Sequence, residues 1–182
     1  RDYIRENYHV IREPLGYIMH NQPPLTFSDD SSLLFCTTES LIQGYDLEDM
    51  ASRYVRWMSE SYWCARGEVF DIGATTAKAL RKYAVGQTKA EQAGDDHPMS
   101  NGNAGVTRCL ALAFWTLAMA PEDMFRHVQQ VSSITHRHPI SICTAFYYVV
   151  YVQNLLTMDK MDAYRATNDL VKGHLKSSSI GQ

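Results

Sequence analysis

The chain alternates between segments whose apolar residues recur at helical spacing and short polar stretches that separate them. Ser28, Asp29 and Asp30 precede the first apolar run, where hydroxyl and carboxylate side chains typically cap a helix. Gly44 follows that run as a typical helix-ending residue. From Asp46 the apolar residues recur three and four positions apart, which indicates a second helix with one buried face. The residues expected on its solvated face are Arg53, Arg56 and Glu60.

Further helices are predicted along the rest of the chain. One begins at Pro121 and ends near His136, because proline is favoured at the first helical position and acids follow it. The other apolar segments predict helices over residues 77–84, 106–119, 139–158 and 159–174. A short helix is expected near the start of the chain, and a long polar loop over residues 87–103. No segment alternates convincingly at period two, so the predicted fold class is all-α.

Length and composition fit a single all-helical domain over residues 1–182. A chain of 182 residues can bury a substantial core, and 45% of its residues are apolar. Its net charge of −3, without a basic stripe, argues against nucleic-acid binding. The four cysteines form no closely spaced pair, so we expect reduced, mostly buried thiols in a cytoplasmic protein.

The uncharged stretch over residues 139–158 is long enough to raise the question of a membrane span. Polar side chains interrupt it at Ser141, Thr144, Gln153 and Asn154. A buried central helix is therefore the better interpretation, and no membrane partner is expected.

Four polar clusters interrupt the helices, and each falls at a predicted helix boundary. A helix bundle that collects its polar interruptions at helix ends can gather them on one rim around a cleft. Glycine within such clusters lets backbone N–H groups approach a phosphate closely. The clusters comprise residues 28–31, 71–73, 100–103 and 135–138.

Each cluster also has a simpler interpretation. Acids at a helix start complement the helix dipole, and an isolated pair such as Asp29 and Asp30 usually does only that. The two glycine-containing clusters fit ordinary turns. His136 and His138 lack a third ligand at zinc spacing, so zinc binding is disfavoured.

The order of the clusters resembles the ADP-ribosylglycohydrolase family, which includes the dinitrogenase-reductase-activating glycohydrolases and the crystallin J1 relatives. The resemblance spans about residues 27–179 and rests on residues 27–31, 70–76, 100–103 and 135–136. It implies an all-helical fold and hydrolysis of the bond that joins ADP-ribose to a protein side chain or another acceptor. The implied partner is an ADP-ribosylated protein or a small molecule that contains ADP-ribose.

The resemblance also implies a pair of Mg²⁺ or Mn²⁺ ions. Ser28, Asp29 and Asp30 match the family's Thr-Asp-Asp metal motif, with serine in place of threonine. Neighbouring residues point about 100° apart on a helix, so each acid is expected to hold one ion of a pair. No residue is assigned as general base. The residues implied to bind the substrate are Asp71, Gly73, Ser100, Asn101, Gly102, Asn103 and His136.

The chain departs from the family pattern in three places. Arg108 matches the arginine that follows the Asn-Gly segment, but Thr107 stands where the family has methionine. The family's acidic opening helix and its closing Asp-x-Asp-Thr motif are both missing, so the domain is expected to be incomplete at both ends. A non-catalytic ADP-ribose-binding or structural member of the same fold is the alternative function, and a helical regulator unrelated to ADP-ribose is a third.

Overall fold

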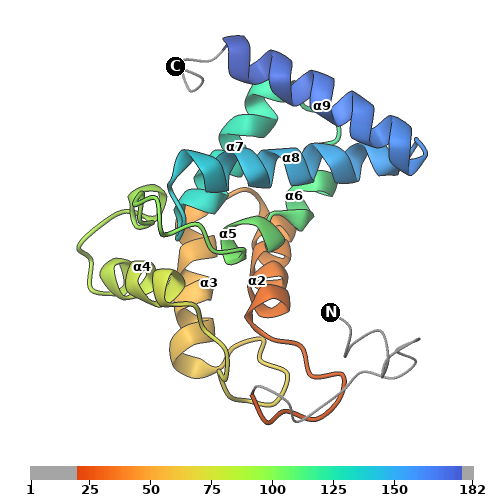
Figure 1. Ribbon diagram of the computed structural model, residues 1–182. Helices are drawn as coiled ribbons and strands as arrows, with labels where there is room; N and C mark the ends of the chain where they lie inside the picture. The colour runs from red at the N-terminus through yellow and green to blue at the C-terminus, as the bar shows by residue number, and fades with distance from the viewer. Residues whose placement is uncertain (1–19, 178–182) are drawn as a thin grey trace.

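Helices form the regular structure of residues 20–177, the part of the chain that the computed structural model describes (Figure 1). The short helix expected near the start of the chain lies outside this part. The all-α prediction is confirmed, since residues 20–177 contain no strand and only an isolated bridge between Asp95 and His136. The elements are α2 (Asp29–Gln43), α3 (Leu47–Glu60), α4 (Ala74–Ala84), η1 (Ala90–Gln92), α5 (Ala104–Thr107), α6 (Leu110–Trp115), α7 (Pro121–Ser133), α8 (Pro139–Leu155) and α9 (Lys160–Ser177).

The residues predicted to begin and end helices do so at several boundaries. Asp46 caps α3 by accepting two hydrogen bonds from backbone N–H groups of its first turn. Pro121 and Pro139 are the first residues of α7 and α8. Gly44 follows α2 with a φ of 125°, a conformation that glycine adopts far more easily than other residues.

The single helix predicted over residues 106–119 is wrong, because this segment is broken into α5 and α6. Hydrogen bonds at the break span three residues rather than four, as at Cys109, whose N–H donates to the Val106 carbonyl at 3.0 Å. The Arg108 side chain at the break is fully buried and donates to two carbonyl oxygens near the end of α7. The break therefore coincides with the anchor that ties this segment to α7.

Three smaller predictions are wrong in detail. Helix α4 begins at Ala74, before the predicted residue 77, and the long polar loop contains the 3₁₀ turn η1. Arg53 is buried rather than solvated, with only 8% of its surface exposed. Its guanidinium forms ion pairs with Glu39 and Asp49, each at 2.6 Å, and these carboxylates compensate its burial.

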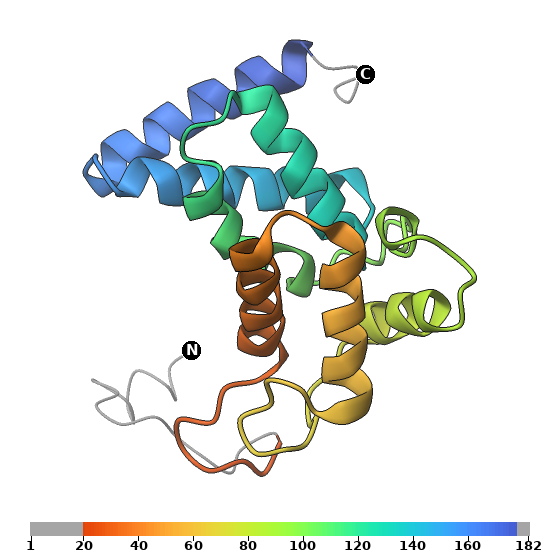
Figure 2. The ribbon, with the colours of Figure 1, turned by 180° about the vertical axis from the view of Figure 1, so that it is seen from behind.

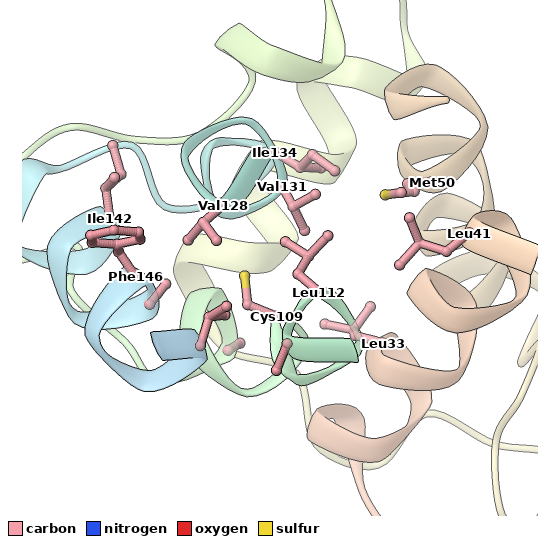
Figure 3. Close-up of a cluster of buried hydrophobic side chains, with 14 of the residues drawn as sticks. Leu33, Leu41, Met50, Cys109, Leu112, Val128, Val131, Ile134, Ile142 and Phe146 are labelled. Atoms are coloured by element: carbon pink, nitrogen blue, oxygen red, sulfur yellow. The ribbon is translucent and has the colours of Figure 1, made fainter. Parts of the chain in front are cut away.

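One cluster of buried apolar side chains joins the helices at the two ends of the molecule. Helices α2 and α3 lie side by side with α4 beyond α3, while α7, α8 and α9 gather at the other end of the molecule (Figures 1 and 2). Side chains from both groups share the core, among them Leu33, Met50, Leu112, Val131 and Phe146 (Figure 3). Within residues 20–177 no helix is both long and apolar enough to cross a membrane.

The loop between α4 and α5 is anchored at its middle to the chain that leaves α7. The N–H of Gly94 donates to the Ser133 carbonyl at 2.9 Å, and the N–H of Arg137 donates to the Asp95 carbonyl at the same distance. The Asp95 carboxylate also pairs with Lys78 of α4 at 2.6 Å. This junction fixes the position of the segment around residue 136 relative to α4.

Candidate functional site

A polar hollow of about 330 Å³ lies where the first residues of α2, α4 and α5 come together. Three of the four polar clusters that the sequence singles out contribute to its wall, and His136 of the fourth joins them. The lining residues are Ser28, Asp29, Asp30, Asp71, Gly73, Ala74, Thr75, Thr76, Met99, Gly102, Asn103, Ala104 and His136. The helix-end clusters thus share one cavity, although they are far apart in sequence.

Carboxylates dominate one side of this hollow. Burial and the neighbouring charges of Asp30 and Asp71 raise the pKa of Asp29, and the Ser28 hydroxyl acts in the opposite direction. The only basic partner of these three acids in the described chain is His20, whose Nε2 lies 3.5 Å from Asp71. Within residues 20–177, the site therefore concentrates negative charge without a lysine or arginine paired to these acids.

The oxygen-only donor set of this acidic side suits a hard divalent cation. Ser28 precedes α2 without using its hydroxyl as a helix cap, so that oxygen is available beside Asp29 and Asp30. Among residues 20–177 no three His, Cys, Asp or Glu side chains converge on a point that could hold a metal ion. The residues present fit a partial Mg²⁺ shell, which such ions commonly complete with water and ligand oxygens.

The start of α4 forms a second side of the hollow, rich in hydrogen-bond donors. Gly73 precedes this helix and offers no side chain to cap it, which leaves the first backbone N–H groups of α4 without a capping partner. Thr76 is buried, and its hydroxyl has no hydrogen-bond partner within the described residues. Unpaired donors at a helix N-terminus suit an anion or a hydroxyl group. Thr76 lies in residues 70–76, one of the segments on which the family resemblance rests, but no role for it is predicted from the sequence.

His136 forms the floor of the hollow as a neutral imidazole. The His136 Nδ1 lies 2.7 Å from the Thr135 hydroxyl oxygen. Only 2% of the surface of His136 is exposed. Burial, helped by the charge of Arg108, lowers the pKa of His136 to about 4. Two glycines allow its close approach, since a Cβ at Gly102 would lie 3.1 Å from Nε2 and one at Gly105 would lie 2.9 Å from the His136 Cβ.

Acidification is expected to destabilise the protein through His136. Because its pKa is about 4 in the folded state and 6.5 ordinarily, the unfolded state binds more protons between these values. The free energy of unfolding should therefore fall as pH drops from 6.5 to 4. Urea denaturation across that range should show a shallower pH slope for His136→Gln. The exposed control His97→Gln should keep the wild-type slope, and an unchanged slope in His136→Gln would contradict the buried neutral state.

Ser100 and Asn101, which the sequence also predicts to bind substrate, do not line the hollow. The Asn101 side chain is held elsewhere, because it donates to the Pro98 carbonyl at 2.6 Å and accepts from the Ser141 hydroxyl at 2.8 Å. The first bond lies within the loop, and the second ties the loop to the start of α8. His138 caps α8, since its Nδ1 accepts a hydrogen bond from the Ile140 N–H in the first turn of that helix.

A larger groove of about 590 Å³ lies between α2 and α6, but its chemistry differs. Its wall is almost entirely apolar and includes Leu34, Ile42, Leu110 and Phe114. Among the described residues its wall offers no charged group, and its polar side-chain groups are the Thr38 hydroxyl and the Trp115 indole N–H, so it is poorly suited to a highly charged ligand. The smaller polar hollow is therefore the candidate site.

Two comparisons with known proteins point to the same family. A family model described as ADP-ribosylglycohydrolase matches residues 1–180. A solved structure described as an "ADP-ribosylglycohydrolase-related protein complex" matches with a TM-score of 0.70 and 26% sequence identity, over 87% of this chain. The match covers 50% of the solved chain, so this chain spans about half its length. No curated protein matches the sequence.

Proposed function

This chain belongs to the ADP-ribosylglycohydrolase family, and from that premise we propose that it hydrolyses the bond between ADP-ribose and an acceptor. The acceptor is a protein side chain or a small molecule. The observation that carries the proposal is the convergence of Asp29, Asp30 and Asp71 with the start of α4 and with His136 around one hollow. A cavity with acids on one side and free donors on the other matches a substrate that has sugar hydroxyls at one end and a diphosphate at the other.

The acidic side is proposed to hold two Mg²⁺ or Mn²⁺ ions. Ser28, Asp29 and Asp30 would supply oxygen ligands, and cation binding would offset the burial and the repulsion that raise the pKa of Asp29. When bound, such a pair of ions supplies coordination of the ribose hydroxyls and orientation of the attacking water. Asp29 and Asp30 act in this proposal as ligands and not as the general base.

The donor side is proposed to hold the diphosphate. The first turn of α4 lines the hollow, so its backbone N–H groups and the positive end of the helix dipole lie at the hollow. Gly73 has no side chain and leaves room for a phosphate beside them. The unpaired Thr76 hydroxyl and the imidazole of His136 add side-chain hydrogen-bonding groups. A neutral imidazole needs no counter-charge, so it can bind the nucleotide without competing with the cations on the other side.

The same arrangement fits the charge that develops during cleavage. Breaking the bond at the ribose anomeric carbon creates oxocarbenium character, which is positive. Asp71 lines the same hollow and is not assigned to an ion, so its carboxylate would stabilise such a charge where it forms. This interaction would favour the transition state over the neutral sugar of the bound substrate.

The direct test is release of ADP-ribose by the full-length protein. It should be incubated with Mg²⁺ or Mn²⁺ and a panel of arginine-linked, serine-linked and small-molecule ADP-ribosyl substrates, with the product measured by liquid chromatography. We expect at least one substrate to be cleaved, with loss of activity in Asp29→Asn. Asp123→Asn, which changes a half-exposed acid of α7 outside the hollow, is the matched control and should retain activity.

Failure to cleave any substrate would contradict the proposal. Calorimetry would then separate the remaining functions. Binding of ADP-ribose without turnover would favour a non-catalytic member of the family, whereas absence of ADP-ribose binding by the metal-loaded protein would favour a regulator with a different ligand.

A further inference from the structure

The Asp30 carboxylate is held by two side chains of the α5 segment, Asn103 just before the helix and Thr107 at its last residue. The Thr107 hydroxyl donates to Asp30 Oδ1 at 2.8 Å, and the Asn103 amide donates to Oδ2 at 3.1 Å. These donors are four residues apart and so lie on one face of the short helix α5. Each carboxylate oxygen therefore accepts one hydrogen bond from α5 and keeps a lone pair free to face the hollow.

The Thr107 hydroxyl makes a different bond from those of other helical threonines in the described chain. Five threonines in helices or at a helix end donate to the carbonyl oxygen four residues earlier, and Thr76 of α4 has no partner among the described residues. The five are Thr37, Thr38, Thr116, Thr144 and Thr167. Thr107 donates to a carboxylate of another helix instead, at a distance of 77 residues along the chain. A hydrogen bond to a charged acceptor is stronger than one to a neutral carbonyl. The Thr107 bond therefore restrains the side chain of its acceptor more strongly than a bond to a carbonyl would.

Thr107 is better placed than Asn103 to fix the carboxylate. Its side chain is half-buried, whereas Asn103 is exposed, and its β-branched side chain has few rotamers. Asp30 itself lies in the first turn of α2, where its side chain can adopt more than one rotamer unless another group holds it. The Thr107 hydroxyl restricts that freedom through its hydrogen bond to Oδ1.

We propose that Thr107 is a positioning residue, which orients the Asp30 carboxylate for divalent-ion binding. This inference rests on the proposed function, because it assigns Asp30 to the metal. The methionine that the family pattern has at this position cannot donate a hydrogen bond, so the device belongs to this chain's own sequence. Partners that orient a metal ligand typically change metal affinity 10- to 100-fold, so an effect of about tenfold or more is expected here.

The test is Mn²⁺ affinity, measured on the full-length protein by calorimetry and by electron paramagnetic resonance of the free ion. Thr107→Val, which keeps the shape and removes the hydroxyl, should weaken Mn²⁺ binding about tenfold, and Thr107→Ala should do the same. Thr107→Ser restores the hydroxyl and should bind within about twofold of wild type. Thr144→Val removes a hydroxyl that bonds only within α8 and should leave Mn²⁺ affinity unchanged.

Melting temperatures separate this role from a purely structural one. Thr107→Val loses a hydrogen bond to a charged acceptor and Thr144→Val loses one to a neutral carbonyl, so Thr107→Val should melt at a somewhat lower temperature, and only Thr107→Val should also lose Mn²⁺ affinity. Wild-type affinity in Thr107→Val, or equal weakening in Thr107→Ser, would overturn the inference and leave the proposed function intact if Asp30→Asn still abolishes binding. Wild-type Mn²⁺ affinity in Asp30→Asn would overturn both.

Discussion

Replacing Asp29 with asparagine should weaken Mn²⁺ binding and, in the ion-free protein, raise the melting temperature. Burial and repulsion from Asp30 and Asp71 raise the pKa of Asp29, so its charge costs folding free energy at neutral pH in the absence of a cation. Asparagine removes that cost and also removes a charged ligand. Loss of a residue that only orients a metal ligand typically weakens metal binding about 10- to 100-fold, and loss of Asp29, a direct ligand in this account, should weaken Mn²⁺ binding by more.

Opposite signs for stability and affinity make this prediction specific. Asp123→Asn changes a half-exposed acid that pairs with Arg126 on the surface of α7, so neither quantity should change appreciably. Differential scanning calorimetry without metal, followed by Mn²⁺ titration, gives both numbers on the same samples. A lower melting temperature with unchanged Mn²⁺ affinity in Asp29→Asn would mean that this acid only complements the dipole of α2.

Replacing Gly94 with alanine is expected to cause the largest loss of stability. A Cβ at this position would lie 2.8 Å from the His136 nitrogen and 2.8 Å from the Thr135 carbonyl carbon, and it would clash with the Ser133 carbonyl oxygen. All three atoms belong to the backbone, so no side-chain rotation relieves the clash. The free energy of unfolding should fall by about 3 kcal/mol, at the upper end of the usual range for overpacking.

Gly173→Ala is the matched control for this substitution. Gly173 lies within α9, and a Cβ there would meet no atom within 4 Å. Because alanine favours helix more than glycine does, the control should gain about 1 kcal/mol. Urea denaturation measures both variants. Equal stability of Gly94→Ala and wild type would show that the junction between the α4–α5 loop and the end of α7 is loose, and would remove the support for the position of His136.

Several helix boundaries followed from local chemistry that the sequence displays directly. Asp46, Pro121 and Pro139 act within one turn of their own position, so their types suffice to predict where α3, α7 and α8 begin. The break between α5 and α6 did not follow, because it accompanies a contact between Arg108 and the distant end of α7. Arg53 was misplaced for a similar reason, since its two acidic partners lie on α2 and α3 and only one is close in sequence.

The candidate site divides in the same way. Asp29, Gly73, Gly102 and His136 stand in recognisable clusters, and the structure brings them to one hollow. Asn101 stands in such a cluster too, but a partner on α8 draws its side chain away. The role of Thr76 depends on the absence of a hydrogen-bond partner for its hydroxyl among the described residues. The role of Thr107 depends on its contact with Asp30, which is distant in sequence. A sequence shows which polar residues occur at helix ends, but the packing decides which of them share a cavity.

The central claim is that the acids at the start of α2 hold divalent ions against the ribose of an ADP-ribosyl substrate. Anomalous diffraction from crystals of the full-length protein soaked with Mn²⁺ and ADP-ribose tests it most directly. The account predicts Mn²⁺ peaks in contact with Asp29 and Asp30, with the ribose beside them and the diphosphate at the start of α4. Occupied ADP-ribose with no Mn²⁺ at these acids, or ADP-ribose bound away from the hollow, would contradict it.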